Sequence, residues 1–147
     1  MAATTSMLHT LRFSLRADAG ECSLEEMRQR VERSLGCTLR PGGERHDMFL
    51  FQGELLGMEV SLGEWRGRER RRTFQLQAGT PAPSDRESGE WVSIDIGPAM
   101  IDLLAAHDAG QWRAPSDEEI IAEAEYGAER ERAAEDEAAE LWRRDDK

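Results

Sequence analysis

Apolar residues alternate with polar ones in four short stretches of the chain, which is the pattern of strands that bury one face. These stretches are residues 11–16, 58–63, 73–78 and 91–96. Residues 48–51 are apolar throughout, and this run predicts a central strand that is covered on both sides. The pattern therefore predicts about five strands.

Two helices are indicated by their end signals. Ser23 and Glu26 form an S-x-x-E capping box ahead of apolar residues at helical spacing, and Gly36 is a natural stop for that helix. Pro98 is tolerated in the first turn of a second, short helix that should lie back on the sheet. Residues 40–43 contain one proline and two glycines and are predicted to form a loop.

A third helix is predicted near the C-terminus. Ser116 and Glu119 form another capping box, and the helix should continue to about Trp142. Gly127 weakens its middle by about 1 kcal/mol relative to alanine, so we expect a bend or a break there. For Leu141 and Trp142, packing back on their own domain is favoured over a contact with a partner.

The order of elements is strand, helix, four strands, helix, helix. Strands joined by short loops pair antiparallel, and the first helix must pack on a face of the same sheet. We therefore predict an α+β fold, with a twisted, mainly antiparallel sheet of about five strands, helices on one side and a C-terminal acidic helix. The alternative is a small β-sandwich or barrel with helices, because Phe49 and Phe51 leave a second apolar face unexplained.

Charge divides the chain of 147 residues unevenly. Residues 116–147 hold thirteen acidic and five basic residues, a net charge of −8, which leaves −3 of the total −11 for residues 1–115. We expect one domain, with residues 1–115 as its body and residues 116–147 as a helix packed on that body or projecting from it. An acidic field argues against nucleic acid as the main partner and favours a basic protein surface or plain solubility.

The remaining chemistry excludes several classes of protein. No apolar run is long enough to cross a bilayer or resembles a signal peptide. Cys22 and Cys37 lack C-x-x-C spacing, which favours two reduced thiols in a cytoplasmic protein, with a single disulfide as the alternative. No histidine has a metal-ligand spacing and no nucleotide-binding motif is present, so we expect no metal, no cofactor and no catalytic activity. A small enzyme that uses His46, Asp47 or Asp95 is the weakest hypothesis.

The chain has one basic cluster, residues 65–72, at the predicted tip of a hairpin. Its Trp65, Arg68, Arg70 and Arg71 have the chemistry of protein–protein hot spots. The alternative is a solvated hairpin whose charges discourage pairing between sheet edges.

Residues IDIGPAMIDLL, followed by GQW and PSDEE, give the chain a sheet strand that leads into helices and then into an acidic helix. With its small size and absence of a catalytic set, the chain resembles the immunity proteins of bacterial polymorphic and contact-dependent toxin systems. The resemblance implies a non-catalytic protein that neutralises one cognate toxin by occluding its active site. The uneven charge points to Asp117, Glu118, Glu119 and Glu123 as the residues that would meet a cationic toxin cleft. The alternative is a regulatory or adaptor domain that acts through protein–protein contacts or homodimerisation.

Overall fold

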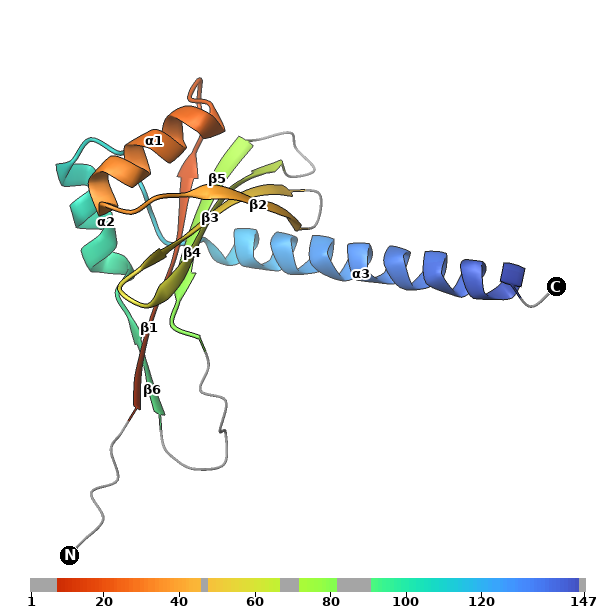
Figure 1. Cartoon of the computed structure of the whole chain (residues 1–147). Coiled ribbons are helices and arrows are strands. Elements are labelled where there is room, and N and C mark those ends of the chain that lie inside the picture. Colours follow the sequence, from red (N-terminus) through yellow and green to blue (C-terminus); the bar gives the residue numbers. More distant parts are fainter. Residues whose placement is uncertain (1–7, 46–47, 67–71, 82–90, 146–147) are drawn as a thin grey trace, which may run out of the picture. The chain divides into compact units, whose positions relative to one another are not determined.

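The computed structural model describes residues 8–45, 48–66, 72–81 and 91–145 (Figure 1). The chain divides into two compact units, Met1–Ala114 and Pro115–Lys147. The first unit contains the sheet and two helices, and the second contains one helix. In chain order the elements are β1 (Leu8–Asp18), α1 (Leu24–Leu35), β2 (Arg40–Arg45), β3 (Met48–Leu55), β4 (Met58–Arg66), β5 (Arg72–Gly79), β6 (Trp91–Asp95), α2 (Gly97–Ala106) and α3 (Asp117–Asp145).

The six strands of the described chain form one open sheet in the order β2-β3-β4-β5-β1-β6. Neighbouring strands are antiparallel except β1 and β6, which pair in parallel. The predicted α+β fold with a mainly antiparallel sheet is therefore confirmed. Because the sheet is single and does not close, the alternative of a sandwich or barrel is wrong.

The predicted loop at residues 40–43 is wrong, since these residues belong to the edge strand β2. Proline is compatible with an edge strand because its missing N–H can lie on the unpaired side. The register of β2 against β3 shifts between Pro41 and Gly43, and Gly43 has a positive φ of 101°. Glycine with a positive φ is found in β-bulges as well as in turns, so Gly43 by itself did not distinguish a bulged strand from a loop.

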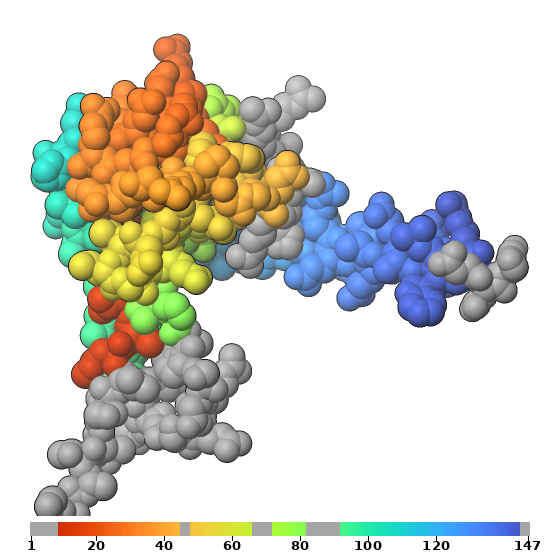
Figure 2. Space-filling view, viewed as in Figure 1, coloured from red at the N-terminus to blue at the C-terminus, as the bar shows by residue number. Residues whose placement is uncertain are grey.

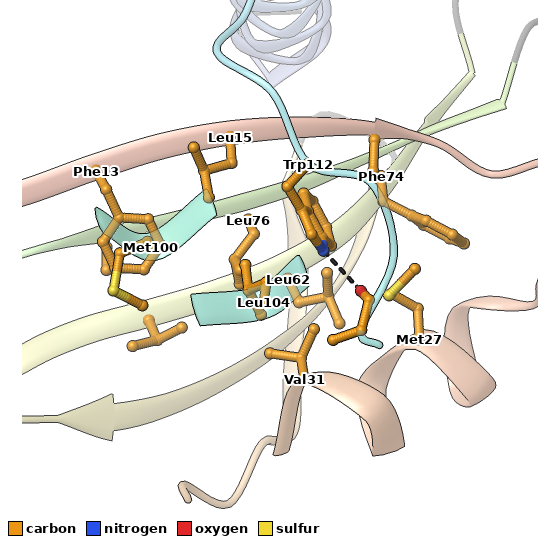
Figure 3. Packing of buried hydrophobic residues seen from close by; sticks show 14 of the residues in the cluster. Phe13, Leu15, Met27, Val31, Leu62, Phe74, Leu76, Met100, Leu104 and Trp112 are labelled. Atoms are coloured by element: carbon orange, nitrogen blue, oxygen red, sulfur yellow. Dashed lines mark hydrogen bonds between the residues drawn. The ribbon is translucent and has the colours of Figure 1, made fainter. Parts of the chain in front are cut away.

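The core lies between the sheet and the helices α1 and α2 (Figure 3). Phe13 and Leu15 on β1, and Phe74 and Leu76 on β5, are at most 2% exposed, as their alternation with polar residues predicted. Both helices contribute to the same cluster, so they cover one face of the sheet. From α1 and α2 the buried residues in it are Met27, Val31, Met100 and Leu104.

The end signals of α1 are confirmed. The Ser23 side chain accepts a hydrogen bond from the backbone N–H of Glu26 at 3.1 Å, and Gly36 ends the helix with a left-handed φ of 67°. Glycine adopts this conformation without the steric penalty that a Cβ would bring. The two caps therefore set the length of the helix that covers the sheet.

The prediction that residues 48–51 form a central strand covered on both sides is confirmed only in part, because β3 pairs with β2 and β4 but is second from the edge of the sheet. Phe51 is 8% exposed and packs beneath the Arg28 guanidinium, 5.2 Å from its ring centroid, but Phe49 is 43% exposed. Phe49 instead lies edge-on against Phe51, with 5.2 Å between the centroids. Leu50 faces the opposite side of the sheet and fills the space beside Gly63. Residues 48–51 are thus apolar because Phe49 and Phe51 pack against each other on one face of the sheet and Leu50 is buried on the other.

The expectation of a buried apolar face on residues 91–96 is also wrong in part. Val92 and Ile94 are 41% and 39% exposed, because β6 is an edge strand that pairs only with β1 among the described residues. Alternation correctly indicated a strand, but it carries no information on whether a neighbour covers the apolar side. Only Ile96, at the end of the pattern, packs against the core.

The free edge of β1 is completed in two stages. β6 pairs with its first half, and the N–H of Ile96 donates to the Arg12 carbonyl at 2.9 Å. The chain then leaves the sheet to form α2 and returns to the same edge, where Arg113 and Arg16 exchange two backbone hydrogen bonds of 2.7 and 2.9 Å. The segment that contains α2 is therefore hydrogen-bonded to β1 at both of its ends.

Trp112 secures the returning chain in the core. It is 4% exposed, and its indole N–H donates to the Ala109 carbonyl at 2.8 Å (Figure 3). Gly110 makes the turn between them with a φ of 100°, and a Cβ there would lie 3.1 Å from the Met27 methyl carbon. A buried indole needs such a partner for its N–H, so the turn and the tryptophan depend on each other.

Gly53 on β3 offers a test of the packing between β3 and the segment that precedes β2. A Cβ at Gly53 would lie 2.3 Å from the Thr38 carbonyl oxygen and 3.0 Å from Leu39 Cδ2. Gly53→Ala should therefore lower the free energy of unfolding by about 1–3 kcal/mol, as overpacking does. Denaturant unfolding would measure this change.

Gly79→Ala is the matched control, because Gly79 also lies in a strand and its nearest neighbour would be the Leu11 carbonyl oxygen at 4.0 Å. Its stability should stay close to that of the unchanged protein. Equal destabilisation of the two variants would contradict the close approach at Thr38.

Candidate functional site

The second unit begins with a complete capping box, as predicted. The Ser116 hydroxyl accepts from the Glu119 backbone N–H at 3.2 Å, and the Glu119 carboxylate accepts from the Ser116 backbone N–H at 3.0 Å. These two bonds satisfy N–H groups that would otherwise lack a partner at the start of α3. The start of the acidic helix is thus defined by local chemistry.

The four acidic candidates Asp117, Glu118, Glu119 and Glu123 lie in the first two turns of α3. Asp117 and Glu118 are exposed, whereas Glu119 and Glu123 are half-buried. Glu119 is committed to the capping box, and negative charge in a first turn also stabilises the helix dipole. Among the four, Asp117 and Glu118 are the residues most accessible to a partner.

The helix α3 is continuous over 29 residues, so the expected break at Gly127 is wrong, and the helix ends at Asp145, close to the predicted end at about Trp142. Arg130 lies over the ring of Tyr126 at 5.8 Å from its centroid, a contact that spans Gly127 on one side of the helix. Such i,i+4 pairs stabilise a helix locally. Figure 2 shows α3 in blue as one uninterrupted rod of side chains.

Large apolar side chains on α3 are exposed. Leu141 and Trp142 are 61% and 76% exposed, and the expectation that they pack back on their own domain stays a prediction. Ile120 and Ile121, at the other end of the helix, are 50% and 58% exposed. Neither isoleucine has a distinguishing signal of its own in the sequence. Ile121, however, lies three heptads before Trp142, and this spacing places both side chains on one side of the helix.

The arginine candidates Arg68, Arg70 and Arg71 lie outside the described residues, so their prediction stays untested. Trp65 is half-buried and pairs with Thr73 across β4 and β5. The neighbouring Arg72 is held within the fold. Its guanidinium forms an ion pair with Glu64, donating at 2.7 Å, and also donates to the Cys22 carbonyl at 3.0 Å.

The residues of the enzyme hypothesis are only partly described. His46 and Asp47 lie outside the described residues, and the Asp95 carboxylate accepts from the Gly97 backbone N–H at 2.8 Å, which anchors the start of α2. A surface hollow of about 380 Å³ brings His107 and Asp108 together with residues of α1, namely Arg30, Arg33 and Ser34. The Ser34 hydroxyl donates to the Arg30 carbonyl at 2.9 Å, so it is directed into its own helix and not toward a base.

Two further kinds of site concern metal ions and reactive cysteines. Among the described residues, no group of three or more histidine, cysteine, aspartate or glutamate side chains is placed to hold a metal ion. Cys22 and Cys37 are free thiols, and burial raises the pKa of both, with Glu32 adding to the rise at Cys37. A raised thiol pKa lowers the thiolate fraction at neutral pH, which makes both cysteines poor nucleophiles.

Comparisons with protein-family models, with curated protein sequences and with solved structures gave no match to this chain. Within the described residues, no helix combines the length and the apolar character that a membrane crossing requires.

Removal of the Ser116 hydroxyl tests the capping box. Ser116→Ala should destabilise the first turn of α3 by about 1 kcal/mol, because the Glu119 N–H loses its acceptor. Amide hydrogen exchange of Glu119 should accelerate accordingly, by about fivefold.

Ser116→Asp is the control, since aspartate supplies an equivalent acceptor at an N-cap position. Its Glu119 amide should exchange at nearly the rate of the unchanged protein. Equal exchange in all three proteins would show that the cap does not hold the first turn.

Proposed function

We propose that this protein is a non-catalytic binding protein, and specifically an immunity protein that neutralises a cognate bacterial toxin by occluding its active site. The observation that carries the proposal is α3, a continuous helix with twelve acidic and four basic residues whose large apolar side chains are exposed. Charged residues that attract a partner, combined with apolar residues that bind it, are the features of a protein–protein interface.

The acidic helix suits a partner with a cationic surface. Toxins that cleave or modify anionic substrates have such surfaces around their active sites, and a complementary charge accelerates association. Asp117 and Glu118, at the exposed start of α3, would meet that surface first. The same charge would repel nucleic acid, so the proposal names a protein as the partner.

The first unit has a different role in this proposal. Its net charge is close to zero, and its core and caps hold a rigid sheet from which the chain leads to α3. No cofactor or metal takes part, and the proposed location is the cytoplasm, where two free thiols with raised pKa values remain reduced.

A regulatory or adaptor domain is the second candidate function. The observation that favours it is Trp142, which is 76% exposed and belongs to the residue type most enriched at interface hot spots. In that case the partner is another protein of the same cell and is not a toxin.

Co-expression tests the main proposal. Cells that express the protein together with the product of the adjacent gene should survive the toxicity of that product, and the two proteins should purify as a complex. Continued toxicity without a complex would refute the immunity function. A complex formed with a non-toxic partner would favour the adaptor.

Charge reversal at the start of α3 tests the role of its acidic residues. Asp117→Lys with Glu118→Lys should slow association with the toxin by about tenfold at low salt, since steering depends on complementary charge. Stopped-flow association at several salt concentrations would measure this.

Glu54→Lys with Glu59→Lys is the matched control, because these exposed residues face each other across β3 and β4 and their replacement changes the net charge equally. The control should associate nearly as fast as the unchanged protein. Equal slowing by both pairs would assign the effect to net charge and not to α3.

A further inference from the structure

Seven positions on one face of α3 follow one another at alternating intervals of three and four residues, over about six turns. Five of these positions are apolar, namely Ile121, Ala124, Ala128, Ala138 and Trp142. This spacing, 3.5 residues on average, keeps side chains on one side of a helix that packs along another helix. All of these residues are exposed. We call this set of positions the seam.

The middle of the seam is acidic. Glu131 and Glu135 occupy its two central positions, between Ala128 and Ala138, and both are exposed. The seam is therefore apolar at its two ends and carries two negative charges at its centre, over a length of about 32 Å at 1.5 Å per residue. An amphipathic surface helix would normally have apolar residues at these central positions as well.

The central glutamates oppose pairing of α3 with a second copy of itself. Glu131 lies at the midpoint of Asp117–Asp145, so in-register pairing brings it against its counterpart whether the two helices run parallel or antiparallel. Each helix also has a net charge of −8 over these residues. Like charges at facing seam positions destabilise a helix pair and thereby exclude that partner.

The geometry points to a basic amphipathic helix of the partner protein as the occupant of the seam, with apolar residues at both ends and two lysines or arginines at its centre. The inference rests on the proposed function and specifies the part of the partner that α3 recognises. The small side chains of Ala124, Ala128 and Ala138 allow the two helices to approach closely, and Ile121 and Trp142 serve as apolar anchors at the ends. The central charge pairs set the register.

Two peptides test this recognition against the full-length protein. Both are helical, about four heptads long, with leucine and alanine at the end positions of the seam and with lysine on the flanks. One has lysine at the two central seam positions, and the other has glutamate there. Fluorescence anisotropy of the labelled peptides should show that the lysine-centred peptide binds at least about tenfold more tightly.

Charge exchange on the protein should reverse this preference. Glu131→Lys with Glu135→Lys should bind the glutamate-centred peptide more tightly than the lysine-centred one. Glu131→Gln with Glu135→Gln should bind the two peptides with nearly equal affinity. Lysine and glutamine are good helix formers, so circular dichroism of both variants should match that of the unchanged protein.

Asp136→Lys with Glu140→Lys is the matched control. These residues are exposed, are also separated by four positions, and lie on the side of α3 away from the seam. The control has the same net charge as the Glu131 and Glu135 lysine variant. It should still prefer the lysine-centred peptide, although both affinities fall together.

The outcomes separate this inference from the proposed function. Absence of binding by the lysine-centred peptide up to about 1 mM, or a preference that the Glu131 and Glu135 variants leave unchanged, would overturn the inference. If co-expression nevertheless protects cells from the toxin, the immunity function is supported, and α3 does not bind a basic amphipathic helix of the toxin through the seam. If the peptide preference reverses as expected but no toxicity is relieved, the seam stands and the immunity function fails.

Discussion

The backbone hydrogen bonds of β1 hold the first unit together. This strand is 11 residues long, and a buried strand must satisfy its N–H and C=O groups on both edges. β5 completes one edge, while β6 and then Arg113 complete the other. Two side chains of the same strand, Phe13 and Leu15, belong to the core cluster that also contains Trp112 and the buried residues of α2. Sheet, core and the path toward α3 are thus organised around one element.

The two units are stabilised in different ways. In the first, caps, a bulge and a closely packed glycine hold an open sheet against two helices, and its acidic and basic residues nearly balance. In the second, a single helix is stabilised by its capping box and by contacts between its own turns, and it leaves Ile121 and Trp142 exposed at opposite ends. A lone helix cannot bury an apolar face within itself. In the proposed complex, the negative charge of α3 attracts the partner, and the seam then packs against that same partner.

Local signals predicted the candidate site only up to a point. Ser116 and Glu119 define the start of α3 through bonds within one turn, so the sequence was sufficient there. The same bonds give Glu119 a structural role, which its S-x-x-E spacing indicates and a count of charges alone does not. Whether a partner or another part of the chain covers Trp142 depends on what lies opposite it in space, which local spacing does not reveal. The seam was present in the spacing of residues, but its significance required the knowledge that all its members are exposed.

Local patterns in the sequence predicted the α+β class, the alternation that places Phe74 and Leu76 in the core, and the helix ends at Ser23, Gly36 and Ser116, because these depend on contacts between residues close along the chain. Contacts between distant segments were needed to establish that residues 40–45 form an edge strand, that β6 pairs in parallel with β1, and that Arg113 pairs with the remaining part of that edge. Pairing between distant segments is selected by the competition of all strands for hydrogen bonds and buried area, and no single stretch of sequence contains that information.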